Sequence, residues 1–189
     1  MNLPNKLTIA RVIAVPFYVA FMLIGAIPCN YLWALLLFGA ASLTDMIDGK
    51  IARKQGLVTD LGKFLDPLAD KVLVSAALIC MVELGWTASY LVIIIICREF
   101  IVSALRLAAA SSNDHTVIAA GIWGKLKTAF TMGAIAVMTL LHILLDNLAF
   151  LDASFPVGLI SDVLMWISTV LTVISGVIYI VSYKHLLKG

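Results

Sequence analysis

The chain has 189 residues, 62% of them hydrophobic and only 13% charged, with a formal net charge of +2. Soluble domains have roughly 45–50% apolar residues with glycine included and about 25% charged residues, so this chain has too little polar surface for a soluble globule. The apolar content excludes a disordered chain, and the small net charge excludes the basic stripe of a nucleic-acid-binding protein. We therefore expect an integral membrane protein.

Six apolar stretches divide the chain, each close to the roughly 20 residues that a helix needs to cross a bilayer core of about 30 Å. We predict transmembrane helices at Leu7–Gly25, Tyr31–Asp48, Leu65–Leu84, Ser89–Ala110, Thr128–Leu145 and Leu159–Tyr183. The first stretch has no A-x-A cleavage site, so we expect it to be retained rather than removed as a signal peptide. Residues 1–189 are predicted to form one all-α membrane domain.

The distribution of lysine and arginine predicts the orientation of these helices. All 13 basic residues fall toward one side of the predicted six-helix bundle, given a turn or two of penetration by a few. The other side, near Ile27, Trp86 and Phe150, carries none. Since cytoplasmic loops are enriched in lysine and arginine, we expect both termini to be cytoplasmic, which agrees with an even number of spans.

Four aspartates lie where the second predicted helix ends and the third begins. Asp45 and Asp48 are three residues apart, and Asp66 and Asp70 are four apart, so each pair projects from one helical face. An ionised aspartate at membrane depth costs roughly 2.5–3.5 kcal/mol on insertion scales. Helix capping or an interfacial position would explain one such residue, but it explains four at this spacing poorly.

Together the four carboxylates hold a charge of about −4, which two divalent cations would neutralise. Oxygen ligands favour hard metals such as Mg²⁺ or Mn²⁺. Two such ions a few ångströms apart form the usual arrangement for displacement at phosphorus. The aspartates therefore predict a two-metal site for phosphoryl chemistry.

Small and basic residues accompany these aspartates. Gly49 and Ala52 each follow an aspartate of the second helix by one turn and leave room for a ligand. Arg53 offers a forked donor that suits phosphate oxygens. Gly62 permits a turn or a close approach before the third helix, and Pro67 is expected near the first turn of that helix, where proline is tolerated.

The string Asp45-x-x-Asp48-Gly49-x-x-Ala52-Arg53, eight residues, then Gly62-x-x-x-Asp66-x-x-x-Asp70 resembles the complete signature of the CDP-alcohol phosphatidyltransferases. The resemblance implies a six-span enzyme that displaces CMP from a CDP-linked lipid with an alcohol acceptor. It also implies that the four aspartates bind two metal ions and that Asp70 acts as general base. The positions implied to bind the CDP-lipid are Gly49, Ala52, Arg53, Thr59 and Gly62, with Asn5 and Thr8 of the segment Asn5-x-x-Thr8-x-x-Arg11 as weaker candidates.

A second set of charged residues lies in the fourth and fifth predicted helices. Arg98 and Glu99 interrupt a very apolar run, and Arg106 follows Arg98 by close to two and a quarter turns, so the two arginines share roughly one face. Glu99 offers a neutralising partner, and Lys125 and Lys127 open the fifth helix. Anchoring at the cytoplasmic face explains Lys127 acceptably but Arg98 poorly, since a buried arginine usually marks a site.

Basic residues beside a metal centre suit a phosphorylated acceptor. The strings Arg98-Glu99-Phe100, Leu105-Arg106 and Gly124-Lys125-Leu126-Lys127-Thr128 resemble the bacterial branch of the family that makes phosphatidylglycerophosphate from CDP-diacylglycerol and sn-glycerol 3-phosphate. The strings Asn2-Leu3-Pro4-Asn5 and Gly62-Lys63-Phe64-Leu65-Asp66 resemble it too. The resemblance implies an enzyme of anionic phospholipid synthesis in a bacterial plasma membrane, with a cytoplasmic active site. The implied contacts for the acceptor phosphate are Arg98, Arg106, Lys125 and Lys127.

Two alternatives remain open from the sequence. Another alcohol could be the acceptor, as in enzymes of the cardiolipin synthase or phosphatidylserine synthase type. A divalent-metal transporter also needs intramembrane carboxylates, but its carboxylates should line a path toward both faces, whereas these cluster at the cytoplasmic ends.

Small residues and cysteines suggest two further features. Gly133, Ala134, Ser175 and Gly176 allow close helix packing, and we expect a homodimer. The three cysteines are expected to be free, because Cys80 and Cys97 lie in apolar runs and Cys29 stands alone.

Overall fold

The computed structural model describes residues 3–55, 60–111, 121–148, 150 and 154–182. Within these ranges, side chains are described except at 3–7, 45–55, 60–68, 70 and 107–111. The regular structure of the described residues is helical, without a strand. The predicted all-α class is therefore confirmed for this part of the chain.

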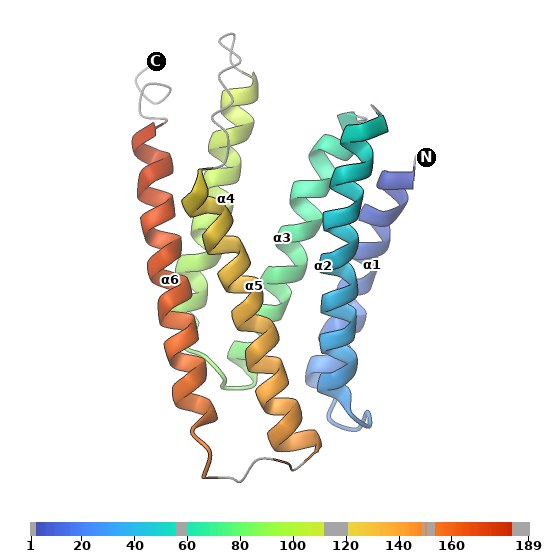
Figure 1. The fold of residues 1–189 in the computed structure, drawn as a ribbon, viewed down its shortest axis with the longest axis vertical. Helices are drawn as coiled ribbons and strands as arrows, with labels where there is room; N and C mark the ends of the chain where they lie inside the picture. The colour runs from blue at the N-terminus through green and yellow to red at the C-terminus, as the bar shows by residue number, and fades with distance from the viewer. Residues whose placement is uncertain (1–2, 56–59, 112–120, 149, 151–153, 183–189) are drawn as a thin grey trace. The chain divides into compact units, whose positions relative to one another are not determined.

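Six α-helices and one short π-helix make up the described part (Figure 1). Each of the six predicted stretches overlaps one α-helix. The π-helix, η1 (Ile143–Asn147), directly continues the fifth α-helix. The α-helices are α1 (Leu3–Leu23), α2 (Asn30–Gln55), α3 (Asp60–Glu83), α4 (Ser89–Ser111), α5 (Ile122–His142) and α6 (Val157–Ser182).

Several predicted boundaries were wrong, because the predicted ranges stopped at polar residues while the helical hydrogen bonding continues through them. α2 runs past Asp48 to Gln55, and α5 begins at Ile122 rather than Thr128. α3 begins at Asp60, so Gly62 lies in its first turn instead of in a preceding turn. The expectation that Pro67 lies near the first turn is also wrong, since it lies about two turns inside α3.

Two helices of the described part are long and apolar enough to cross a membrane: Ile122–Asn147 and Val157–Ser182. The segments Thr8–Leu23 and Asn30–Thr44 are shorter apolar helices. α4 carries Arg98, Glu99 and Arg106 within its length, which lowers its hydropathy. The helices thus agree with a membrane protein, while six spans and their orientation stay predictions.

The helices form two compact units. The first comprises Met1–Leu84 and Ile135–Val157, and the second comprises Gly85–Ala134 and Gly158–Gly189. α5 therefore contributes its first part to the second unit and its last part, with η1, to the first.

In the first unit, α1 packs against both α2 and α3, and it runs antiparallel to α2 (Figure 1). α1 buries one stripe, which includes Tyr18 and Met22, each 1% exposed. The ring of Tyr18 lies against that of Phe38 in α2, with 6.0 Å between the centroids. This aromatic pair fixes the register between α1 and α2.

In the second unit, polar side chains are buried where α5 and α6 meet. Thr131 of α5 and Ser168 of α6 share a hydrogen bond of 2.6 Å between their hydroxyls. The buried stripe of α6 consists largely of small hydroxyl residues, namely Ser161, Ser168, Thr169, Thr172 and Ser175. Small polar residues let membrane helices approach closely and join through hydrogen bonds. Of the small residues noted in the sequence, Ala134, Ser175 and Gly176 are thus buried within the chain, whereas Gly133 meets open space.

Candidate active site

The first acidic pair lies on α2, in continuation of that helix's buried stripe. The described buried residues of α2 include Ala34, Phe38 and Ala41, spaced four and three residues apart. The same alternation carried along the helix reaches positions 45, 48 and 52. Because α2 is unbroken to Gln55, the two aspartate positions continue the register of that stripe.

The second acidic pair lies on α3 in the same manner. α3 buries Ala69, Leu73 and Ala77. Steps of three and then four residues toward the start of the helix reach positions 66 and 62, and position 70 follows Ala69 directly. Of the predicted residues here, the side chains of Asn5, Asp45, Asp48, Gly49, Ala52, Arg53, Gly62, Asp66 and Asp70, and the whole of Thr59, lie outside the described residues.

α1 adds two buried polar residues to this end of the unit. Thr8 is 1% exposed and Arg11 is 4% exposed, and both lie on the stripe that contains Tyr18. Arg11 precedes Tyr18 by seven residues, and position 45 follows Phe38 by seven, about two turns or roughly 10 Å in each helix. Because Tyr18 and Phe38 are in contact and the helices are antiparallel, Arg11 lies level with position 45.

Thr8 was predicted as a ligand-binding residue, whereas Arg11 was not. In the sequence, Arg11 counts as one more cytoplasmic basic residue. The signal that could have distinguished it is its spacing of seven from Tyr18, which puts both on one face. A buried guanidinium needs anionic groups around it, and the aspartate positions of α2 lie at its level.

The acidic end of the first unit suits hard divalent cations by the chemistry of its donors. Four aspartates occupy positions that continue the register of the buried stripes of two helices, and carboxylate oxygens are the ligands that Mg²⁺ and Mn²⁺ prefer. The buried Arg11 shows that this part of the unit accommodates strong charge. These observations make it the candidate metal centre.

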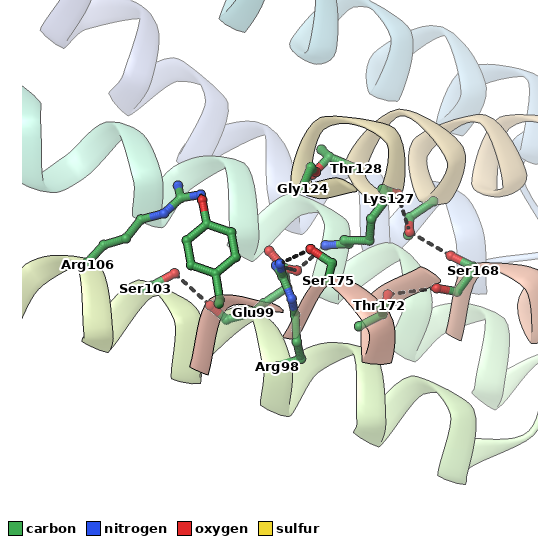
Figure 2. A network of polar contacts seen from close by, with 12 residues as sticks. Arg98, Glu99, Ser103, Arg106, Gly124, Lys127, Thr128, Ser168, Thr172 and Ser175 are labelled. Atoms are coloured by element: carbon green, nitrogen blue, oxygen red, sulfur yellow. Dashed lines mark hydrogen bonds and ion pairs between the residues drawn. The ribbon is translucent and has the colours of Figure 1, made fainter. Parts of the chain in front are cut away.

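A basic cluster lies in the second unit, where α4, α5 and α6 meet (Figure 2). The cluster consists of Arg98, Glu99, Lys127, Ser175 and the pair Arg106–Tyr179. Glu99 Oε1 accepts hydrogen bonds from Arg98 Nη1 at 3.0 Å and from Lys127 Nζ. The side chains of Arg98, Glu99 and Lys127 are only 12%, 18% and 3% exposed. One carboxylate therefore holds two buried cations from two helices.

α6 supplies the remaining partners of the arginines. Arg98 Nη2 donates to Ser175 Oγ at 2.6 Å, as Figure 2 shows. Arg106 Nη2 donates to the hydroxyl of Tyr179, and its guanidinium carbon lies 4.9 Å from the centroid of the Tyr179 ring. The guanidinium carbon of Arg98 lies 5.7 Å from the same centroid. A single buried tyrosine thus contacts both arginines.

Two glycines lie against this cluster, and one of them makes the close packing possible. A Cβ atom at position 176 would lie 3.1 Å from Cγ of Arg98, tighter than an ordinary contact. A Cβ atom at position 124 would lie 3.6 Å from Cε2 of Tyr179. Gly176 therefore lets Arg98 lie against α6, whereas the distance at Gly124 is an ordinary van der Waals contact.

A small cavity lies beside the cluster. Its volume is about 120 Å³, and Tyr179 and Ser175 line it together with residues at the start of α5 such as Trp123 and Gly124. Neither Arg98 nor Arg106 lines this cavity. The cavity therefore lies against Ser175 and Tyr179 of the cluster and not against its arginines.

The structure brings together three of the four predicted acceptor-phosphate residues. Arg98, Arg106 and Lys127 belong to the cluster, and the predicted partnership of Arg98 with Glu99 is confirmed. Lys125 is exposed and makes no polar contact with the described residues. The ammonium group of Lys127 is buried and hydrogen-bonded to Glu99.

Sequence reasoning missed Ser175 as an arginine partner and missed Tyr179 altogether. α6 is so apolar that its small polar residues were assigned to packing alone. The available signal was the spacing of four between positions 175 and 179, which places both on one helical face.

The charges of the cluster favour a doubly charged anion. Two arginines and one lysine contribute three positive charges, and Glu99 removes one. A phosphate monoester carries close to two negative charges at neutral pH, and arginine is well suited to bind its oxygens.

Comparison with known proteins gives a consistent result. A family model described as CDP-alcohol phosphatidyltransferase matches residues 1–174. A protein of Bacillus subtilis (strain 168) named CDP-diacylglycerol–glycerol-3-phosphate 3-phosphatidyltransferase is 44% identical over 186 residues, covering 93% of this chain and 91% of the relative. A protein of the same name from Rickettsia bellii is 37% identical, with 97% and 96% covered. A Mycobacterium tuberculosis protein named probable phosphatidylglycerophosphate synthase is 35% identical, with 95% and 80% covered.

Proposed function

The chain belongs to the CDP-alcohol phosphatidyltransferase family, and on that premise we propose that it transfers the phosphatidyl group of CDP-diacylglycerol to sn-glycerol 3-phosphate. The products are phosphatidylglycerophosphate and CMP. The observation that supports the choice of acceptor is the basic cluster, in which Arg98 and Arg106 are held beside Tyr179; we assign a phosphate monoester to these two arginines. The names of the similar proteins support the same substrates.

We assign the donor lipid to the acidic end of the first unit. Asp45, Asp48, Asp66 and Asp70 would hold two divalent ions, Mg²⁺ or Mn²⁺. When bound, these ions would neutralise the diphosphate and stabilise the charge that develops on the departing CMP. Gly49, Ala52, Arg53, Thr59, Gly62, Asn5 and Thr8 are assigned to the CDP group, and the burial of Thr8 on the inward stripe of α1 supports its assignment.

The reaction proceeds by a single displacement. Asp70 accepts the proton of the glycerol 1-hydroxyl, and the resulting oxygen attacks the lipid-side phosphorus. A new P–O bond forms to glycerol 3-phosphate, the bond to the bridging oxygen breaks, and CMP departs with the electron pair. A protonated alcohol is a poor nucleophile, so the reaction needs a base at the attacking hydroxyl. Asp70 is the side chain of this chain that we assign to that role.

We assign the acceptor's phosphate to Arg98 and Arg106, with Lys125 as a further exposed cation near the start of α5. Lys127 acts through Glu99, which it helps to hold. A phosphodiester such as the headgroup of phosphatidylglycerol carries one negative charge fewer, and serine carries no phosphate. The cluster therefore favours glycerol 3-phosphate over the acceptors of cardiolipin and phosphatidylserine synthesis.

We further propose a single membrane domain of six spans in a bacterial plasma membrane, with cytoplasmic termini and active site, functioning as a homodimer. The agreement between the predicted apolar stretches and α1 to α6 supports the six spans. The clustering of all basic residues toward one side supports the orientation.

The proposal is tested with purified protein in detergent, CDP-diacylglycerol and Mn²⁺, by varying the alcohol and measuring CMP and the lipid product. We expect CMP release with glycerol 3-phosphate and formation of phosphatidylglycerophosphate. Asp70→Asn should lose most of its turnover while the protein remains folded. If no CMP is released with any alcohol, the proposal is contradicted and a transporter is favoured. Near-normal turnover of Asp70→Asn would contradict the base role.

A further inference from the structure

Two arginines of α4 are arranged around one aromatic ring of α6. Arg98 and Arg106 have their guanidinium carbons 5.7 and 4.9 Å from the centroid of Tyr179. The ring is 4% exposed, so it is fixed by its surroundings. The electron-rich face of an aromatic ring attracts cations at these distances. Tyr179 therefore contacts both cations.

The two arginines differ in what else holds them. Arg98 has the carboxylate of Glu99 and the hydroxyl of Ser175 as partners. Arg106 donates to the hydroxyl of Tyr179, and no described carboxylate pairs with it. Two like charges beside one ring repel each other, and among the described residues only Arg98 has an acid as its partner. An anion that binds both arginines would relieve this repulsion.

The backbone around Tyr179 is built to keep the ring in place. The start of α5 lies against the ring edge, since a Cβ at Gly124 would be in ordinary van der Waals contact with Cε2 of Tyr179 at 3.6 Å. Gly176 and Ser175 bring Arg98 against the turn of α6 that precedes the ring. The orientation of Arg106 is thus determined by a hydroxyl whose own position is determined by three helices.

We propose that Tyr179 is a positioning residue for the acceptor, which sets the spacing of Arg98 and Arg106 so that they bind one dianionic phosphate monoester. This inference rests on the proposed function for the identity of that monoester. Tyr179 does not touch the reacting atoms in this account. It acts by orienting Arg106 through its hydroxyl and both arginines through its ring.

The experiment uses the purified full chain in detergent with three variants. Tyr179→Phe keeps the ring and removes the hydroxyl, and Tyr179→Leu removes both. Tyr90→Phe is the matched control, because Tyr90 belongs to the same unit, is 53% exposed and lies against Trp166 rather than an arginine. CMP release is measured as a function of glycerol 3-phosphate and, separately, of CDP-diacylglycerol.

We expect Tyr179→Phe to raise the KM for glycerol 3-phosphate about fivefold and Tyr179→Leu to raise it about 30-fold, since a hydrogen bond to a charged group and a cation–π contact are lost in turn. The kcat and the KM for CDP-diacylglycerol should stay within about twofold of the parent. Tyr90→Phe should match the parent in all three constants. A lower kcat with an unchanged KM for glycerol 3-phosphate, or equal changes in both KM values, would overturn the proposal.

A binding measurement separates this inference from the proposed function. Glycerol 3-phosphate or inorganic phosphate should raise the melting temperature of the parent protein without donor lipid, and Tyr179→Leu should abolish the increase. If the parent releases no CMP with any alcohol but shows this Tyr179-dependent shift, the transferase function fails and the anion site stands. If the parent is an active transferase and the shift persists in Tyr179→Leu, the role of Tyr179 fails and the function stands.

Discussion

Glu99 holds cations from α4 and α5, so its replacement by glutamine should destabilise the protein through the charge it leaves behind. Lys127 is 3% exposed, and Glu99 Oε1 accepts its hydrogen bond. Without the carboxylate, the lysine ammonium stays buried and lacks this ionic partner, and Arg98 loses its ion pair as well. Breaking a buried pair by removing one partner costs about 3–5 kcal/mol. Because Glu99 is 18% exposed, we expect the lower end, about 3 kcal/mol.

This cost can be measured with a double-mutant cycle. In a chain of this length, about 3 kcal/mol corresponds to a fall in melting temperature of roughly 6–12 °C. Glu99→Gln, Lys127→Met and the double variant should show a coupling of about 2–3 kcal/mol, because the double variant removes both buried charges. Unfolding is followed by intrinsic fluorescence in detergent micelles.

The exposed ion pair of the first unit supplies the matched control. His142 Nδ1 and Asp146 Oδ2 are 3.0 Å apart, and the Asp146 side chain is 46% exposed. Asp146→Asn should therefore change the stability by no more than about 0.5 kcal/mol. Additive losses for Glu99→Gln and Lys127→Met would refute the claim that these residues act as a buried pair.

Three further predictions concern single residues. Gly176→Ala should raise the KM for glycerol 3-phosphate severalfold, because its Cβ would press on Arg98 Cγ at 3.1 Å, whereas Gly133→Ala, which meets open space, should leave it unchanged; equal effects of the two would contradict this packing argument. Arg106→Ala should raise that KM about 10- to 100-fold, since a charged hydrogen bond is worth roughly 1.5–3 kcal/mol; an unchanged acceptor KM refutes the assignment. Arg11→Met should lower the melting temperature in EDTA by about 5 °C or more, because the acidic positions lose a buried countercharge, and saturating Mn²⁺ should recover most of the loss; an equal loss in both conditions would show that Arg11 serves packing alone.

Much of the fold was predictable because the chain's apolar stretches are long and well separated. Each predicted stretch coincides with one helix, since about 20 apolar residues between polar breaks leave few other structures in a membrane. The ends were less predictable, as α2, α3 and α5 show. The helices include polar residues such as Asp60 and Lys125. Hydropathy alone does not predict that a helix extends into such polar residues.

Site residues were predicted most accurately where their spacing along one helix determines which face they share. The separation of Arg98 and Arg106 by eight residues correctly predicts that both reach one cluster. Ser175 and Tyr179 escaped prediction because their role depends on how α6 packs against α4, a contact between residues far apart in the chain. The burial of Arg11 likewise depends on the register set by Tyr18 and Phe38.

The most direct test of the central claim compares glycerol 3-phosphate with glycerol as acceptors, with CDP-diacylglycerol and Mn²⁺ held constant. The two alcohols share the attacking hydroxyl and differ only in the phosphate that the basic cluster would bind. Two lost charged hydrogen bonds at roughly 1.5–3 kcal/mol each predict a kcat/KM for CMP release at least about 100-fold higher with glycerol 3-phosphate. Equal values for the two acceptors would contradict the account.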